Sequence, residues 1–161
     1  CMRVEKLYKE MTAGSTLKIT DNIRIETLWP LEIKEENAQD ENKNCSVFMI
    51  YYDKYKIMVT GDLDSEGERE MIRYYGNSGR LRADVLKIGH HGSKTSTCEE
   101  FLKCVSPKIA VVQVGKNTYG HPASETLQRL EKQGCMLFRN DWDGAIGLCL
   151  KEESIQIHTV L

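Results

Sequence analysis

Two apolar segments, each ending on a glycine beside a metal-competent side chain, constrain this sequence most. The first is KYKIMVT, which ends at Gly61-Asp62, and the second is LRADVLKI, which ends at the motif GHHGS, residues 89–93. A helix-like segment, residues 65–75, lies between them. Carboxylate and imidazole groups both suit zinc or manganese, and the end of a buried strand holds a side chain rigidly. The pattern therefore predicts two strands that carry metal ligands at one edge of a sheet.

The remaining sequence predicts a mixed α/β domain. Ile23 and Ile25 alternate with Arg24 and Glu26, which is typical of a half-buried antiparallel strand. Further along, strands and helices alternate, and this order predicts a sheet with helices packed on one face. The expected strands are residues 15–18, 22–28, 45–52, 56–60, 83–89, 108–114, 135–139, 145–150 and 154–160, and the expected helices are residues 65–75, 96–104 and 123–133.

Local signals predict how two of the helices begin. Ser65 and Glu68 have the spacing of a capping box, in which the two side chains satisfy free backbone N–H groups at the start of the first helix. Ser96 or Thr97 is a suitable cap for the second helix. We therefore expect both helices to be capped by residues of their own first turn.

Composition and charge exclude several classes of protein. The 161 residues are 40% hydrophobic and 29% charged, which is typical of a globular domain. The formal net charge of −2 gives no global case for binding nucleic acid or a membrane, although a local groove can still be basic. No apolar run approaches the roughly 20 residues that span a bilayer, and no cysteine forms a C-x-x-C pair. Residues 1–11 predict a short helix or an entry segment, and the acidic residues 31–44 predict a solvated loop.

The histidine pair is the sharpest functional candidate. One of His90 and His91 can ligate a metal while the other contacts substrate or orients the ligand. Neighbouring side chains on an extended strand point to opposite sides, so we expect only one to ligate unless the chain has already turned. Gly92 would let the backbone approach a bound molecule closely. The alternative is a pair of surface histidines with no metal.

Four further residues complete the candidate set. Asp62 could ligate a metal, and its alternative role is to cap the segment that follows. Ser93 and Lys94 could hold an anionic group such as phosphate. His121 follows the next buried strand and would face the same edge, or it would simply cap the following helix. Ligands in open α/β sheets gather outside the carboxyl ends of strands, which favours a single site.

Five segments occur in a fixed order along the chain: NCSV, VTGDLDSEGERE, LRADVLKIGHHGSKTS, VGKNTYGHP and NDWDGAI. Together they resemble the metallo-β-lactamase-like domain of the ComEC/Rec2 competence proteins, over roughly residues 19–146. The resemblance implies an αββα sandwich and a hydrolase site that holds two divalent metals, zinc or manganese. It implies phosphodiester hydrolysis by a nuclease, in a protein linked to DNA uptake in natural competence.

The resemblance also implies roles for individual residues. Asp62 would be the carboxylate that bridges both metals, and one of His90 and His91 would be the last metal ligand. His121 would lie near the scissile phosphate or support the site. Ser93 and Lys94 would lie on the substrate side.

The sequence departs from the family pattern in one large respect. The main metal motif of the family, H-x-H-x-D-H, is absent. We therefore expect residues 1–161 to form a single partial domain, the C-terminal half of the family fold. Such a chain would hold metal only partially or not at all, and would be inactive alone. The alternative is a degenerate module of the same fold, kept for binding or assembly.

The missing half of the domain is accordingly the first expected partner. A DNA or other phosphoester substrate is the second. Half a sandwich exposes an apolar sheet face or edge, which would also favour a homodimer. The sequence leaves the compartment open, whereas the resemblance implies an extracytoplasmic part of a membrane competence protein.

Overall fold

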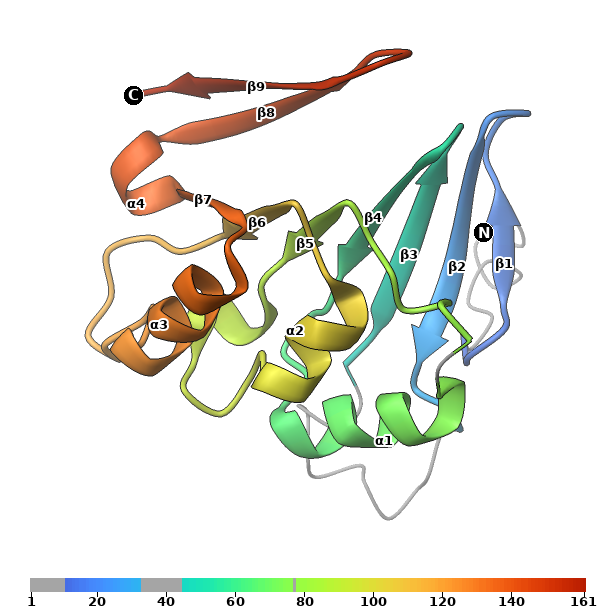
Figure 1. The fold of residues 1–161 in the computed structure, drawn as a ribbon, viewed down its shortest axis with the longest axis horizontal. Helices are drawn as coiled ribbons and strands as arrows, with labels where there is room; N and C mark the ends of the chain where they lie inside the picture. Colours follow the sequence, from blue (N-terminus) through green and yellow to red (C-terminus); the bar gives the residue numbers. More distant parts are fainter. Residues whose placement is uncertain (1–10, 33–44, 77) are drawn as a thin grey trace, which may run out of the picture.

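A seven-stranded mixed sheet with helices on one side forms the centre of the molecule (Figure 1). The computed structural model describes residues 11–32, 45–76 and 78–161. The expected helix or entry segment at residues 1–11 and the loop at residues 31–44 fall almost wholly outside these ranges. Among the described residues, no helix has the length and apolar character that crossing a membrane requires. The sheet and its helical layer confirm the expected α/β architecture.

The strands occupy the sheet in the same order as in the chain. Pairing is antiparallel through the first four strands and parallel from β4 to β7. The strands are β1 (Thr16–Lys18), β2 (Ile23–Trp29), β3 (Val47–Tyr52), β4 (Tyr55–Val59), β5 (Val85–Lys87), β6 (Ile109–Val112) and β7 (Met136–Arg139).

The parallel half of the sheet explains why the helices share one face. Each crossover between neighbouring parallel strands is right-handed as a rule, so successive crossovers in one direction leave their helices on the same side. Figure 1 shows this layer along the lower side of the sheet. The helices are α1 (Ser65–Tyr75) between β4 and β5, α2 (Glu99–Val105) between β5 and β6, and α3 (Ser124–Gln133) between β6 and β7.

The hydrophobic core lies between the sheet and this helical layer. Strand register aligns Met58, Leu86 and Ala110 across three parallel strands, and all three are fully buried. Phe101 of α2 and Leu130 of α3 belong to the same buried cluster. Burying one such side chain stabilises the fold by roughly 1.5–3 kcal/mol relative to exposing it.

The opposite face of the sheet carries a mostly apolar row that the helices do not cover. Register places Val59, Lys87, Val111 and Phe138 side by side on this face, and all four are partly exposed. Met136 in the neighbouring row is 55% exposed. We call these five residues the bare face. Apolar surface of this kind commonly marks a place where another polypeptide packs.

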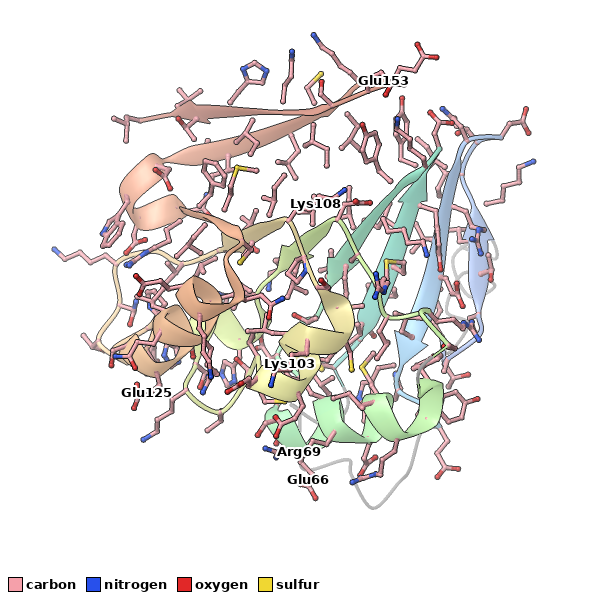
Figure 2. All side chains as sticks on the ribbon, viewed as in Figure 1. Glu66, Arg69, Lys103, Lys108, Glu125 and Glu153 are labelled. Carbon is pink, nitrogen blue, oxygen red and sulfur yellow. The ribbon has the colours of Figure 1, made fainter. Side chains whose placement is uncertain are left out.

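A terminal hairpin begins a second layer on the side of the bare face. The chain passes from β7 through the single turn α4 (Asn140–Asp143) to β8 (Ala145–Leu150) and β9 (Ile155–Val160), which pair only with each other. Tyr55 donates a hydrogen bond from its hydroxyl to the carbonyl of Lys151, at 2.8 Å. Lys54 and Glu153 form an ion pair at 3.5 Å at the same end of the hairpin, where Figure 2 labels Glu153.

The start of α1 differs from the expected capping box. Asp64 is the N-cap, and its carboxylate accepts hydrogen bonds from the backbone N–H groups of Glu66 and Gly67 at 3.1 and 3.0 Å. The prediction that Ser65 and Glu68 cap this helix is wrong. The reason is that the chain is still extended at Asp64, so its short carboxylate already satisfies these N–H groups.

Glu68 has a different task in the interior. Its side chain is fully buried, and its two oxygens accept hydrogen bonds from the backbone N–H groups of Thr97 and Cys98 at 2.5 and 2.7 Å. These N–H groups lead into α2, whose N-cap Cys98 makes no side-chain capping bond. The prediction that Ser96 or Thr97 caps α2 is therefore wrong, because a carboxylate from α1 takes that role.

Burial raises the pKa of Glu68 to about 7, although the two backbone N–H groups oppose this shift by favouring the charged form. The folded state therefore binds more protons than the unfolded state between about pH 4.3 and pH 7. The stability that this raised pKa contributes is complete below about pH 4.3, and it is lost as the pH rises through about 7.

We expect Glu68→Gln to remove this pH dependence while losing one hydrogen-bond acceptor at all pH values. The free energy of unfolding in urea should be measured for both proteins between about pH 5 and pH 8. The advantage of the wild type over the variant should shrink with rising pH, by at most about 3 kcal/mol. A difference that stays constant across this range would contradict the prediction.

Candidate functional site

The candidate residues follow the carboxyl ends of three neighbouring parallel strands. Asp62 follows β4, and His90 lies in the short 3-10 segment η2 (Gly89–Gly92) after β5. His121 lies in the loop between β6 and α3. Since parallel strands end at the same edge, the three residues are brought to one side of the sheet.

A backbone hydrogen bond connects the first two strand ends. The N–H of His90 donates to the carbonyl of Gly61 at 2.9 Å. Gly61 has φ +50, and a Cβ atom there would lie 2.9 Å from the backbone oxygen of Ser46. The glycine is therefore required, because a side chain here would be strained at this φ and would meet the backbone of Ser46. Asp62 follows directly, and the capping role that was its alternative belongs to Asp64.

The two adjacent histidines have separate environments. Both have left-handed backbone angles, with φ 47 for His90 and φ 52 for His91, so the chain has already turned here. His91 is exposed, and its Nδ1 lies 2.6 Å from the carbonyl oxygen of Gln113. The Nδ1 of His90 is buried and has no hydrogen-bond partner among the described residues. This makes His90 the better candidate ligand of the pair.

His121 lies against His90. Their ring centroids are 5.7 Å apart with the planes at 67°, an edge-to-face arrangement. The Nδ1 of His121 is likewise buried without a partner in the described part of the chain. Burial lowers the pKa of His121, and the nearby His90 and His91 lower it further, so the ring is neutral at neutral pH. His121 does not cap α3, because the N-cap there is Ala123.

Gly92 allows the third strand end to reach the first two. A Cβ at Gly92 would lie 2.6 Å from Cβ of Pro122, and the carbonyl of Gly92 accepts a hydrogen bond from the N–H of Ala123 at 2.8 Å. We predicted that this glycine admits a bound molecule, but Pro122 of the same chain occupies the space. This close packing of Pro122 on Gly92 keeps the neighbouring His121 near His90.

Hydrogen bonds to α3 fix the turn that follows η2. Ser96 donates from its hydroxyl to the carbonyls of Gly89 and Ser93, at 2.9 and 3.1 Å. Thr126 of α3 donates to the same Ser93 carbonyl at 2.8 Å, and Arg129 donates to the carbonyl of Ser96 at 2.9 Å. The backbone beside the histidine pair is therefore held from two sides.

The two predicted phosphate-binding residues lie in this turn and differ in exposure. Ser93 is only 6% exposed, and its hydroxyl lies 3.0 Å from that of Thr95. Lys94 is exposed. Of the two, only the Lys94 side chain is free to reach a phosphate from this position.

Asp62 lies near two residues that sequence reasoning did not connect with it. Burial raises the pKa of the Cys45 thiol to about 11; the backbone hydrogen bond from Asp62 opposes this rise, and the charge of Asp62 adds to it. The thiol therefore stays protonated at neutral pH. Burial lowers the pKa of Lys87 on the bare face, whereas the charge of Asp62 raises it. Asp62 thus acts electrostatically on the side of the sheet that the helices leave uncovered.

The described residues do not complete a metal site by themselves. Among them, no group of three or more His, Cys, Asp or Glu side chains could hold a metal ion. A zinc site normally needs at least three protein ligands. The buried, unpartnered nitrogens of His90 and His121 nevertheless fit donors to a metal held jointly with other ligands.

No protein-family model matches the chain. It is 37% identical over 141 residues to ComE operon protein 3 of Bacillus subtilis and 40% identical over 127 residues to competence protein ComA of Neisseria gonorrhoeae. These matches cover 86% and 78% of the chain. Recombination protein 2 of Haemophilus influenzae is 33% identical over 57% of the chain. The chain is homologous to part of the ComEC-family competence proteins. It spans only 11–18% of the length of these relatives.

A solved structure supports the fold of this chain. The structure is that of a protein proposed to be a metal-dependent hydrolase, from Parabacteroides distasonis. It has a TM-score of 0.51 and 16% sequence identity, and the match covers 84% of this chain and 59% of that protein. The likeness agrees with the expected metallo-β-lactamase-like fold.

Asn117 organises the loop that carries His121, and sequence reasoning missed it. Its side-chain amide donates to the carbonyls of Gly115 and His121, at 2.9 and 2.8 Å. Its oxygen accepts from the N–H groups of Tyr119 and His121, both at 3.1 Å. The signal was present, since asparagine between glycines is a strong turn former.

Sequence reasoning also missed that Glu68 supports the turn after the histidine pair, although a signal for it was present. It shares the buried stripe of α1 with Met71 and Tyr75, at spacings of three and seven residues. A carboxylate on an apolar stripe needs buried donors, and the turn after the histidine pair supplies them.

We expect Asn117→Ala to loosen the His121 loop and to lower the free energy of unfolding by about 1–2 kcal/mol. Amide hydrogen exchange of His121, measured by NMR, should become faster. Asn117→Asp keeps the two acceptor contacts but loses both donors, so its effect should be intermediate. Unchanged exchange at His121 in Asn117→Ala would show that the side chain does not hold the loop.

Proposed function

We propose that this chain supplies one side of a metal-dependent phosphodiesterase site in a ComEC-type competence protein that takes up DNA. The observation that carries the proposal is that the Nδ1 atoms of His90 and His121, beside the Gly61-Asp62 turn, are buried and have no hydrogen-bond partner among the described residues. Two such nitrogens in neighbouring rings are costly unless something binds them. Homology to competence proteins supports the DNA context.

The position of each candidate residue in this chain suggests its role. Asp62 and His90 would hold metal. Neutral His121 would either accept or orient a proton near the phosphate, or serve as a further metal ligand. Lys94, exposed beside the turn, would neutralise charge on the substrate. When bound, divalent metals in such sites lower the pKa of water and stabilise the attacking and leaving oxygens.

The remaining ligands would come from the N-terminal half of the domain, which would pack on the bare face. The chain corresponds to 59% of the solved hydrolase-like fold, so a substantial part of that fold has no counterpart here. Val111 and Phe138 are partly exposed on the face where such a half would sit. Burial lowers the pKa of Lys87 on this face, and the charge of Asp62 opposes that shift, which supports a site beside the same face.

A non-catalytic module for binding or assembly is the second candidate function. The observation that favours it is the lack of any group of three metal-competent side chains among the described residues. It predicts that Asp62 and the histidines can be replaced without loss of function. The following experiment separates the two.

We expect Asp62→Asn to abolish hydrolysis once the domain is completed. The chain would be joined to an N-terminal half that carries H-x-H-x-D-H and assayed with Mn²⁺ or Zn²⁺ on bis-p-nitrophenyl phosphate. The loss should be at least about 100-fold, because even residues that only support a metal ligand contribute about 10–100-fold. Asp21→Asn is the control: it changes an exposed carboxylate that is distant from Asp62 in the sequence, and it should retain activity.

Two results would contradict parts of this proposal. Full activity of Asp62→Asn would favour the non-catalytic module. Clear metal-dependent hydrolysis by the unjoined chain would show that it is not an incomplete site.

We expect Val111→Lys to block assembly of the completed domain while leaving the isolated chain folded. Val111 is only partly buried, so the longer side chain can reach solvent until another layer packs over it. Mixing the chain with a separate N-terminal half and measuring association by light scattering tests this. Leu17→Lys on β1, at a residue 50% exposed, is the matched control. A wild-type chain that forms only homodimers, lost in Val111→Lys, would instead assign the bare face to a second copy.

A further inference from the structure

Tyr119 stands out among the exposed aromatic residues because of where it lies. Its side chain is 83% exposed, more than Trp142 at 67% or Tyr74 at 63%. A single exposed aromatic ring is common and needs no explanation. Tyr119, however, belongs to the loop between β6 and α3 that also carries His121, and Figure 1 shows this loop projecting at the left of the molecule.

The position of the Tyr119 ring is defined by the loop. Asn117 accepts a hydrogen bond from the N–H of Tyr119 at 3.1 Å, which anchors its backbone. The ring of Tyr119 is nearly parallel to that of His121, at 28° with centroids 6.2 Å apart. His121 in turn contacts His90, so a row of three rings leads from the exposed tip of the loop to the candidate metal edge.

A small open cavity lies beside this row. It measures about 200 Å³, and its walls include Tyr119, His121, His91 and Lys116. Lys116 is exposed and brings a positive charge to the rim. A flat aromatic surface beside a cation is the pairing that binds single-stranded nucleic acid, since bases stack and phosphates need neutralising.

We propose that Tyr119 stacks on a base of single-stranded nucleic acid and that Lys116 binds a neighbouring phosphate. The loop would then hold the strand beside His90 and His121. This inference rests on the proposed phosphodiesterase function and specifies its substrate, an unpaired strand recognised through base and phosphate together. Such binding needs positive charge only at this loop, so it is compatible with a net charge of −2 for the whole chain.

Binding of a fluorescent short oligothymidylate to the full chain, measured by anisotropy at low salt without metal, tests the inference. Tyr119→Ala should weaken binding about tenfold, whereas Tyr119→Phe keeps the ring and should stay within about twofold. An abasic oligonucleotide of equal length should be bound equally by the wild type and both variants. Lys116→Ala should weaken both probes and reduce the salt dependence.

Tyr74→Ala removes a comparably exposed tyrosine from α1 and is the matched control, expected to bind as the wild type does. Three results would overturn the inference. These are no binding by the wild type, equal binding of oligothymidylate by wild type and Tyr119→Ala, and equal weakening by Tyr74→Ala. Since neither metal nor turnover enters the assay, its failure leaves the Asp62 experiment unaffected, and an inactive completed domain leaves the stacking result unaffected.

Discussion

Parallel pairing of β4, β5 and β6 is the constraint on which every feature of the candidate site depends. It places the residues that follow each strand at one edge, where short-range contacts can join them. The first contact is the hydrogen bond from the N–H of His90 to Gly61. The second is the close approach of Pro122 to Gly92. Both glycines have positive φ, and a side chain at Gly92 would meet Pro122, while one at Gly61 would meet the backbone of Ser46.

Buried polar groups then make this edge rigid. Glu68 accepts two backbone N–H groups at the start of α2, and Ser96 and Thr126 hold the turn after the histidine pair. Such groups are costly to bury unless they are satisfied, so the turn has few alternative conformations. The unsatisfied nitrogens of His90 and His121 contrast with this network and single out the place where a further group would bind.

Helices cover one face of the same sheet, whereas the other face is covered only in part, since Val85 and Ile109 are buried there but the neighbouring row is not. Helices bury Met58 and Leu86 completely, whereas Val59 and Val111 on the bare face stay partly exposed. This asymmetry agrees with homology to only 11–18% of the length of the ComEC-type relatives. If the other half of the domain supplies both the missing ligands and the missing layer, its absence explains the partial ligand set and the partly exposed sheet face together.

The sequence by itself determined the order and type of the elements. Apolar periodicity located α1 at the residues where it is found, and it located β2 and β3 to within two residues, because burial depends directly on the spacing of apolar side chains. Glycine-punctuated strand ends also indicated Asp62, the histidine pair and His121 as neighbours. Only the tertiary structure decided which groups face one another. Asp64 rather than Ser65 caps α1, Glu68 from another helix serves α2, and His91 turns to Gln113 while His90 turns to His121. These outcomes depend on contacts between segments far apart in the chain, and local spacing carries no information about them.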